Sequence, residues 1–424
     1  MKIHVKGGRL VDPAHGIDAP RDLYLAAGKV VGVGTPPDGF SANRTLDASG
    51  CVVAPGLIDL SARLREPGFE YKATLESEMA AAVAGGVTSL ACPPDTDPPL
   101  DEPGLVEMLK FRARSLNQAK VFPLGALTVG LAGATLTEMA ELTDAGCVGF
   151  AQADVAVADT LVLMRALQYA ATFGFSVWLR PEEGSLAQGG VAHDGEVATR
   201  LGLPPLSPCA ETVAVSTLLL LARETGVRLH LCRLSTREGL EMVRRAKEEG
   251  MSVTCDVSAH HVHLSELDVG YFDSNCHLRP PLRSLRDRDA LREGLIDGTV
   301  DAICSDHTPV DDDAKQRPFA ESEPGATGLE LLLPLALKWA RECKVPLARA
   351  ISLITAQPAR ILGLDLGHLR AGHAADVCVF DPDREWTVAP RALRSQGKNT
   401  PFLGFEVLGR VRWTLVDGQV VHEG

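Results

Sequence analysis

The residues best suited to chemistry are histidines and an aspartate that lie in or directly after apolar segments. His260, His261 and His263 fall within four positions, His230 lies in an earlier apolar run, and Asp306 follows a later one. Neutral imidazole and carboxylate groups bind divalent metals because each offers a lone pair without a positive charge. His230 alternates with core residues, which favours a packed histidine. A metal site built from these residues is one hypothesis, and a structural role, which we favour, is the other.

The composition of the chain argues against several other kinds of site, partner and location. The ten cysteines include no Cys-x-x-Cys pair, which argues against a structural zinc site or a redox dithiol. The 424 residues carry 42 Lys and Arg against 55 Asp and Glu, so the net charge of −13 disfavours nucleic acid and anionic membranes as partners. No apolar run approaches the roughly 18 residues of a membrane span, and the first ten residues lack a signal-peptide core. We therefore expect a cytoplasmic protein.

Strand-like and helix-like segments alternate through most of the chain, as in a parallel α/β fold. Eight short apolar runs predict strands at 56–60, 87–92, 120–124, 147–150, 176–179, 227–232, 252–257 and 301–304. Helical periodicity between them includes 76–84, 136–145, 160–169, 211–224, 237–249, 287–295 and 329–340. Eight such units predict a (β/α)8 TIM barrel over residues 54–365, in which the long loops 181–209 and 260–291 lie on the catalytic face. Residues 1–53 and 366–424 carry short strands and predict one composite β-sandwich domain.

The first predicted barrel strand carries a recognisable motif. Residues 55–68 read PGLIDLSARLREPG, which resembles the dihydroorotase pattern Pro-Gly-x-Ile-Asp-x-His-x-His-x-Arg-Glu-Pro-Gly of the amidohydrolase superfamily. Further motifs match in order at 85–88, 234–236, 260–261, 280–283, 305–309, 328–330 and 372–376. The resemblance implies an amidohydrolase-type barrel. In active relatives it also implies reversible closure of N-carbamoyl-aspartate to dihydroorotate on one or two metals, typically zinc.

The metal-binding positions implied by the resemblance have been replaced. Four histidine positions hold Ser61, Arg63, Arg180 and Arg233, and Gln152 stands where the family has a bridging Asp or carboxylated Lys. Of the family's ligands only Asp306 remains, and the pair His260-His261 matches residues that do not bind metal in the family. Arginine stays protonated and has no lone pair to donate, so it repels a divalent metal. We expect no metal and no other cofactor.

The positions that bind substrate in the family have also changed. Arg65 matches the arginine that binds the substrate carboxylate. Asp95 and Arg279 replace two asparagines, and Val310 replaces a histidine. An aspartate at position 95 would repel the carboxylates of the substrate. Binding of the family's substrate is therefore not expected.

The arginines at the barrel mouth suggest two roles. In the first, Arg63, Arg180 and Arg233 replace the positive charge of the metals, with Asp306, Asp154 and Glu182 or Glu183 as counter-charges in a metal-free polar plug. In the second, the arginines bind a small anion, because a cationic mouth attracts phosphate or carboxylate. We favour the first.

The replaced residues are similar to those of the noncatalytic dihydroorotase-like chains that some bacteria pair with the catalytic chain of aspartate carbamoyltransferase. That resemblance implies a pseudoenzyme and a structural or activating partner of the transferase in pyrimidine biosynthesis, within a hetero-oligomer that is a dodecamer in such relatives, and also self-association. One alternative is an active dihydroorotase or related cyclic amidohydrolase with an atypical metal site at His260, His261, His263 and Asp306. Another is an anion-binding regulatory subunit.

Overall fold

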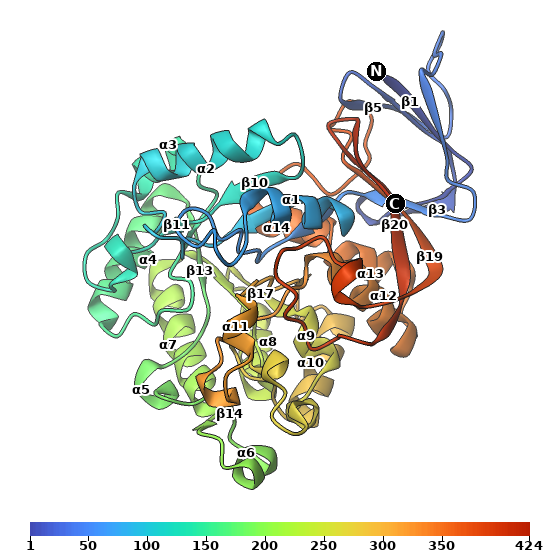
Figure 1. Ribbon diagram of the computed structural model, residues 1–424. Coiled ribbons are helices and arrows are strands. Elements are labelled where there is room, and N and C mark those ends of the chain that lie inside the picture. The colour runs from blue at the N-terminus through green and yellow to red at the C-terminus, as the bar shows by residue number, and fades with distance from the viewer.

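The computed structural model describes residues 1–424 and consists of a large α/β body with a smaller β lobe (Figure 1). The body contains two parallel sheets, with strand orders β10-β9-β8 and β11-β12-β13-β16-β17-β18. Their bounds are β8 Leu57–Asp59, β9 Val87–Cys92, β10 Lys120–Pro123, β11 Gly125–Ala126, β12 Phe150–Ala151, β13 Ser176–Leu179, β16 Arg228–Leu231, β17 Val253–Ser258 and β18 Ala302–Cys304. The parallel pairing follows the chain order, as the alternating sequence pattern predicts.

Backbone contacts join the segments that follow the first and last strands of this series. Ala62, after β8, forms a parallel bridge with His307, after β18. The Arg63 amide donates to the His307 carbonyl (2.9 Å), and the His307 amide donates to the Ser61 carbonyl (3.0 Å). The ends of β8 and β18 are therefore held together, and side chains that follow these two strands can meet.

Helices cover the outside of the strands. They are α1 Leu75–Ala84, α2 Pro103–Ser115, α3 Met139–Ala145, α4 Thr160–Phe173, α7 Cys209–Thr225, α8 Arg237–Glu248, α10 Leu285–Asp297, α12 Leu332–Glu342, α13 Leu347–Leu353 and α14 Ala356–Leu362. The helix α2 is not among those expected from periodicity, because it buries only Val106, Leu109 and Ala113 and exposes the apolar residues Met108 and Phe111, which blur its apolar period. Helix α1 begins at Thr74, whose side chain forms a capping box with Ser77.

The fourth predicted strand is shifted in the structure. The fourth strand was expected at 147–150, but β12 covers only Phe150–Ala151. Helix α3 ends at Gly146 in a left-handed conformation (φ 108°), so the chain first turns through 147–149 before it enters the sheet. The long segments 181–209 and 260–291 contain short elements: α5 Gly184–Ala187, β14 Ala192–His193, α6 Glu196–Leu201, β15 Pro205–Leu206 and α9 Ala259–His263.

The two chain termini meet in the β lobe, where both are visible in Figure 1. One sheet has the order β5-β4-β1-β6, and the other has the order β21-β20-β19-β7-β2-β3. The bounds are β1 Lys2–Lys6, β2 Arg9–Asp12, β3 Ile17–Pro20, β4 Leu23–Ala26, β5 Lys29–Val33, β6 Arg44–Asp47, β7 Val52–Pro55, β19 Val377–Thr387, β20 Glu406–Val416 and β21 Gln419–Glu423. A core of 16 buried residues, among them Ile3, Leu23, Val377 and Leu415, draws on both ends of the chain.

One segment of the predicted terminal domain packs against the large body instead. Between β19 and β20, the Ser395 hydroxyl donates to Glu78 of α1 (2.7 Å), and the Asn399 side chain donates to the Thr308 carbonyl (3.0 Å). These polar contacts place the segment beside the end of β18. The terminal residues thus contribute directly to the surroundings of Asp306.

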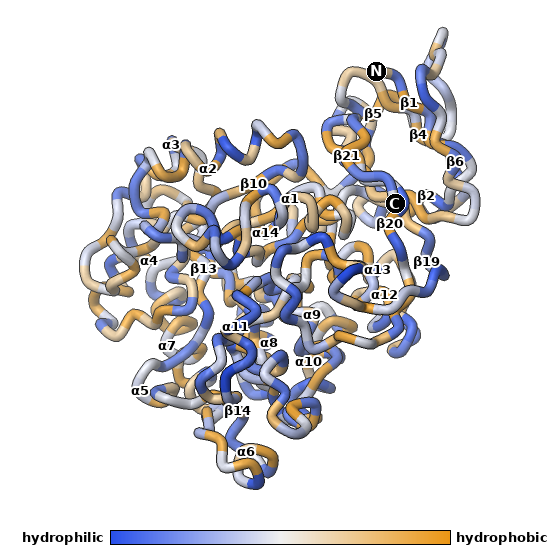
Figure 2. Tube along the Cα trace, viewed as in Figure 1, coloured by the Kyte–Doolittle hydropathy of each residue, from blue (hydrophilic) through white to orange (hydrophobic).

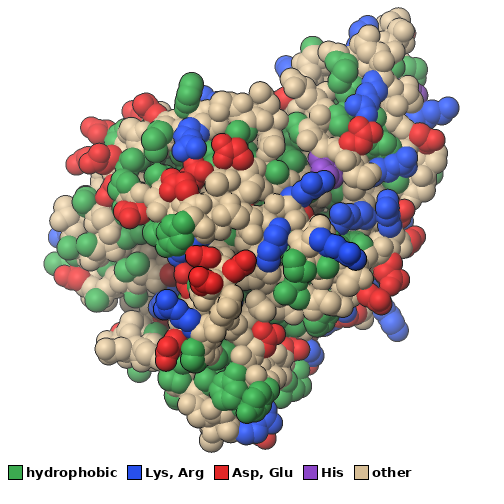
Figure 3. Space-filling model, viewed as in Figure 1, with side chains coloured by type: hydrophobic (Ala, Val, Ile, Leu, Met, Phe, Trp, Pro, Cys, Tyr) green, Lys and Arg blue, Asp and Glu red, His purple; other side chains and the backbone are tan.

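Polar and charged residues gather in particular regions of the chain and of its surface. The chain around α11 (Asp312–Lys315) and β14 is hydrophilic (Figure 2). On the visible face, acidic side chains gather near α11, and Lys and Arg side chains lie over β19 and β20 (Figure 3). None of the helices is both long and apolar enough to cross a membrane.

Candidate functional site

The predicted site residues lie at the carboxyl ends of the parallel strands, where barrel enzymes carry their chemistry. Ser61, Arg63 and Arg65 follow β8, Asp95 follows β9, Gln152 and Asp154 follow β12, Arg180 and Glu182 follow β13, Arg233 follows β16, and Asp306 follows β18. Because these strands are parallel, residues far apart in the sequence meet at one edge. Eight of the side chains at this edge form one group of ion pairs, which we call the arginine–carboxylate cluster: Arg63, Arg180, Arg233, Arg279, Asp95, Asp154, Glu182 and Asp306.

Asp154 is the centre of the cluster, since it accepts hydrogen bonds from three arginines. Its Oδ2 accepts from Arg63 Nη2 at 2.7 Å. Its Oδ1 accepts from Arg180 Nε at 2.7 Å and from Arg233 Nη2 at 2.6 Å. Guanidinium–carboxylate hydrogen bonds of this length are among the strong ones in proteins. One carboxylate therefore holds the three arginines that stand at predicted metal-ligand positions.

The other carboxylates complete the pairing of these arginines. Asp95 accepts from Arg63 Nε at 2.7 Å. Asp306 accepts from Arg233 Nη1 at 2.9 Å and lies 3.6 Å from Arg63 Nη1. The retained aspartate of the family pattern is thus an ion-pair partner of two arginines, as the polar-plug hypothesis requires.

Glu182, not Glu183, belongs to the cluster. Glu182 accepts from Arg180 Nη1 at 2.6 Å and also pairs with Arg279. The Glu183 carboxylate instead accepts from the Leu186 amide at 2.7 Å and caps α5. The cluster therefore contains four guanidinium groups and four carboxylates, so its formal charges cancel.

Burial and charge act against each other on the pKa values of this cluster. Burial alone would raise the pKa of Asp154, but Arg233, Arg63 and Arg180 outweigh it and hold this pKa well below its usual range. The pKa of Glu182 is lowered in the same way, against burial, by Arg180 and Arg279. At Asp306 burial dominates and raises the pKa, with Arg233 and Arg63 offsetting only part of that effect.

The backbone around the cluster is strained at four non-glycine residues. Ala153 (φ 50°), Arg233 (φ 55°) and Asp306 (φ 48°) adopt positive φ values two residues after a strand ends, and Arg65 (φ 65°) does so in the loop after β8. Each such residue costs on the order of 1 kcal/mol or more, and strain of this kind gathers at functional sites. The backbone at the mouth thus has the geometry of a functional site although the predicted metal ligands are replaced.

Several predicted site residues lie outside the cluster. Gln152 donates to Thr128 Oγ1 (2.8 Å) and to the Leu131 carbonyl (2.9 Å), so its amide is satisfied by a neighbouring loop. The Ser61 carbonyl accepts from the His307 amide (3.0 Å). Arg65, expected to bind a carboxylate, donates to the Pro309 carbonyl (2.8 Å). Val310 is buried, and its amide donates to Asn399 (3.1 Å).

The histidines of the alternative metal site do not converge. His261 bonds to Ser258 Oγ (2.7 Å) and to the Pro281 carbonyl (3.1 Å), and His263 bonds to the Leu335 carbonyl (2.8 Å). His260 stacks on Phe402 with ring centres 5.8 Å apart. Burial lowers the pKa of His260 to about 3 and the pKa of His261 to about 4, so both stay neutral. Neither of the two clusters of candidate metal ligands in the structure includes these histidines or Asp306, so the structure does not support a metal site made from them.

His230 lies in a separate buried group. Its Nε2 is 3.0 Å from Asp256 Oδ2, and its Nδ1 is 2.9 Å from Thr254 Oγ1. Cys232 is near enough that His230, Asp256 and Cys232 each place one ligand atom within 4.8 Å of the others. Because both imidazole nitrogens already have protein partners, the structure favours the packed role expected for His230.

The residues present at the mouth do not fit the metal of active relatives. A catalytic zinc normally takes about three protein ligands with free lone pairs. Here guanidinium groups occupy three of the expected ligand positions, and both Asp154 and Asp306 are engaged by them. Ion pairs join the side chains at the mouth to one another. They leave no set of groups with free lone pairs that could bind a metal cation.

Sequence reasoning missed some members of this region. The Thr308 hydroxyl accepts from Arg63 Nη1 (3.0 Å), although residue 308 was only part of a matched motif. Glu323 pairs with Lys72 and lies 4.0 Å from Arg65 Nη2. Both come from loops whose position depends on tertiary packing. Asp95 was interpreted only as a lost substrate contact, whereas its charge was the signal for the ion pair with Arg63.

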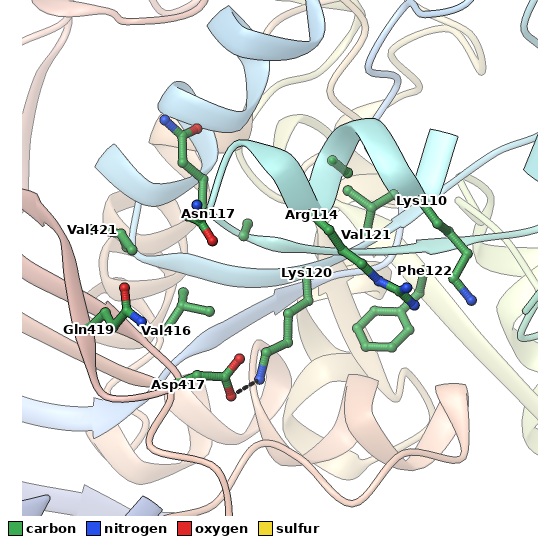
Figure 4. Close-up of a pocket in the computed structure, with 13 residues that line it drawn as sticks. Lys110, Arg114, Asn117, Lys120, Val121, Phe122, Val416, Asp417, Gln419 and Val421 are labelled. Atoms are coloured by element: carbon green, nitrogen blue, oxygen red, sulfur yellow. Dashed lines mark hydrogen bonds and ion pairs between the residues drawn. The ribbon is translucent and has the colours of Figure 1, made fainter. Parts of the chain in front are cut away.

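A cavity of about 480 Å³ lies elsewhere, between α2, β10 and the turn from β20 to β21 (Figure 4). Lys110, Arg114, Lys120 and Phe122 line it. Lys120 donates to Asp417 at 2.7 Å. Lys120 begins β10, so this cavity lies at the amino ends of the strands and is not the counterpart of a barrel active site.

Comparisons with known proteins agree with this architecture. The family described as Dihydro-orotase-like matches residues 50–239, and the Amidohydrolase family matches residues 193–421. A dihydroorotase-like protein of Pseudomonas aeruginosa is 46% identical over the full length of both chains. A dihydroorotase of Geobacter sp. strain M21 is 41% identical, again over the full length of both.

Solved structures show the same fold. The L-hydantoinase of Arthrobacter aurescens matches with a TM-score of 0.89 and 26% identity over 99% of this chain and 96% of that one. A D-hydantoinase matches with a TM-score of 0.85 at 22% identity, over 100% of this chain and 95% of that one. The amidohydrolase-type fold expected from the motifs is confirmed. The chain belongs to the dihydroorotase-like amidohydrolase family.

Proposed function

We propose that this protein is a catalytically inactive dihydroorotase homologue that acts as a structural or activating partner of the aspartate carbamoyltransferase catalytic chain. The observation that carries the proposal is the arginine–carboxylate cluster. Arg63, Arg180 and Arg233 stand where active relatives have metal-binding histidines, and they bond to Asp154 and Asp306. The positive charge that a metal would supply is already present in the side chains.

The charge balance of the cluster favours a plug over an anion-binding site. Each of its four guanidinium groups contacts at least one of its four carboxylates. An incoming phosphate or carboxylate would have to displace a buried carboxylate and leave that group unpaired, which is costly. The role of an anion-binding regulatory subunit is therefore the less favoured candidate for the mouth.

The partner follows from the resemblance to noncatalytic chains that assemble with the transferase. A folded chain whose predicted metal-ligand positions hold arginines, with Asp306 engaged by two of them, is suited to assembly rather than turnover. We propose a cytoplasmic hetero-oligomer, a dodecamer of six chains of each kind, built on a closed (β/α)8 barrel with a terminal β-sandwich. The bridge between Ala62 and His307 and the shared core of the two termini support that architecture.

The catalytic half of the proposal is tested by turnover. The purified chain is assayed for dihydroorotate formation from N-carbamoyl-aspartate, with and without added zinc, beside the 41% identical Geobacter dihydroorotase as a positive control. We expect turnover from the control and none from this chain. Zinc-dependent turnover that disappears in Asp306→Asn would overturn the proposal and support the atypical enzyme.

The assembly half is tested by co-purification. The chain is co-expressed with the aspartate carbamoyltransferase catalytic chain of the same organism, and the complex is sized by light scattering. We expect co-elution at a mass near that of six copies of each chain, and higher transferase activity in the complex than in the catalytic chain alone. Separate elution of the two chains at micromolar concentration would contradict this half and leave the catalytic half standing.

A further inference from the structure

A group of histidines and carboxylates lies far from the barrel mouth, where the loop after α14 meets the turn after β2. Asp365 bonds to two imidazoles: His368 Nε2 is 2.8 Å from its Oδ1, and His373 Nδ1 is 2.9 Å from its Oδ2. The ligand atoms of these three residues all lie within 4.8 Å of one another. The ring of His15 contacts the ring of His368 from the other segment, with centres 5.5 Å apart.

The spacing of the rings fits a shared tetrahedral ion. With zinc–nitrogen bonds of about 2.0–2.1 Å, each ring centre lies about 3.2 Å from the metal, so two imidazoles on one tetrahedral zinc have centres about 5.2 Å apart. The centres of His368 and His373 are 5.0 Å apart, and those of His15 and His368 are 5.5 Å apart. The ring planes of His368 and His373 lie at 76° to each other, and those of His15 and His368 lie at 87°, so the rings do not stack.

A buried carboxylate orients the third histidine. Asp12 is 1% exposed, and its Oδ2 lies 2.8 Å from His15 Nδ1. The same oxygen accepts from the Leu369 amide at 2.9 Å, which ties the two segments together. Metal-binding histidines commonly donate one ring nitrogen to a carboxylate in this way, which leaves Nε2 for the ion.

We propose that His15, His368, His373 and Asp365 form a binding site for Zn²⁺ or a similar transition-metal ion. The bound ion would join the loop after α14 to the turn after β2. Three imidazoles and one carboxylate are a complete tetrahedral ligand set for zinc. All four side chains are at least partly exposed, so the ion can enter from solvent. This site is separate from the barrel mouth and is independent of the proposed function.

One neighbour competes with the metal. Arg370 Nε donates to His373 Nε2 at 2.8 Å and so keeps the proton of His373 on Nδ1, which faces Asp365. Metal binding through Nδ1 moves that proton to Nε2, where it would meet the guanidinium. Removal of Arg370 should therefore strengthen binding, whereas removal of a ligand should weaken it.

The test is titration of the full-length protein with ZnCl₂ by calorimetry, together with the visible absorption of bound Co²⁺. We expect one zinc per chain, a tetrahedral Co²⁺ spectrum, at least tenfold weaker zinc binding in His368→Ala and His373→Ala, and at least threefold tighter binding in Arg370→Ala. Mg²⁺, which prefers oxygen ligands, should give no heat. Asp306→Asn is the matched control and should bind zinc as the wild type does.

Three results would contradict the proposed zinc site. If the wild type binds no zinc, or if His368→Ala and His373→Ala bind it unchanged, the proposed site is wrong. If binding is instead lost in Asp306→Asn, the metal sits at the barrel mouth, and the metal-free plug is overturned along with this site. Circular dichroism of each variant checks that the chain is folded.

Discussion

The barrel mouth and the polar networks around it differ in how their charges are satisfied. In the arginine–carboxylate cluster, carboxylates pair with arginines that stand at the positions predicted for metal ligands. In the surrounding networks, three buried carboxylates, Asp59, Glu78 and Glu211, are satisfied by amides, hydroxyls and one histidine. Residues of three matched motifs take part in these networks: Ser235 and Thr236 bond to Glu211, and Ser305 bonds to Asp59.

A hydroxyl or amide that satisfies a buried carboxylate has a structural role, and its loss leaves that carboxylate unpaired. A metal-binding histidine has no such role once the metal is absent, so other side chains can take its place if their charges are compensated. Replacement of a carboxylate should therefore change the free energy of unfolding by different amounts in these two kinds of site.

The largest effect is expected from Glu211→Ala. Glu211 accepts from the Thr236 amide (2.8 Å) and hydroxyl (2.6 Å) and also from Ser235, all buried. Hydrogen bonds to charged groups contribute about 1.5–3 kcal/mol each, so we expect a loss of about 4–5 kcal/mol in the free energy of unfolding, measured by urea denaturation. Glu224→Ala, at the exposed end of the same helix α7, is the control and should change stability by less than about 0.5 kcal/mol.

Asp154→Asn should cost about 3 kcal/mol by the same measurement. The substitution leaves Arg63, Arg180 and Arg233 without their common counter-charge, and removal of one partner from a buried ion pair typically costs about 3–5 kcal/mol. We take the lower end because the Asp154 side chain is 28% exposed. Asp144→Asn, an exposed aspartate on α3, is the matched control. A neutral effect of Asp154→Asn would show that the cluster is not held by this charge.

The pH dependence of stability should differ in sign between the two regions. Burial raises the pKa of Asp59 to about 6, with Ser305 offsetting part of the effect, so the folded state binds a proton that the unfolded state has released. Stability from this group is therefore lost as pH rises from about 4 to about 6, by about 2 kcal/mol, and Asp59→Asn should remove that slope.

The lowered pKa of Asp154 has the opposite effect on the pH dependence of stability. Its contribution is present above about pH 4 and is lost as pH falls further, and Asp154→Asn should remove only that acid-side loss. Denaturation of both variants across pH 3–7 checks the two signs.

The smallest effect is expected from Asp306→Asn. Burial raises the pKa of Asp306 despite Arg233 and Arg63, so its charged form is no more stable in the folded protein than in water. We expect a change within about 1 kcal/mol, in contrast to Asp154→Asn in the same cluster. A loss as large as that of Asp154→Asn would show that both carboxylates are needed to neutralise the arginines.

Much of the fold could be predicted because it depends on local patterns. The expected segments 87–92, 176–179 and 301–304 correspond to β9, β13 and β18 within one residue at each end. Exposed apolar residues on α2, Met108 and Phe111, blur its apolar period, and β12 is shifted by the left-handed turn at Gly146. These differences arise where local sequence carries little information about burial.

The candidate site was predictable only in part. That Arg63, Arg180 and Arg233 need counter-charges follows from residue type alone, because buried cations must be paired. The counter-charges Asp154, Asp306 and Glu182 were among those expected, but which arginine contacts which carboxylate does not follow, since long side chains can reach several carboxylates. Asp95 and Thr308 were not assigned to Arg63, although both contact it.

The sequence by itself determined the order of strands and helices, the presence of arginine at the predicted metal-ligand positions and the need for compensating charge. Only the tertiary structure decided that Asp154 is shared by three arginines and that Glu182 faces the mouth while Glu183 caps a helix. It also brought His15 next to His368, more than 350 positions away in the chain. The physical reason is that pairing between charged groups depends on which strand ends and loops meet in space, and no periodicity of the sequence encodes that.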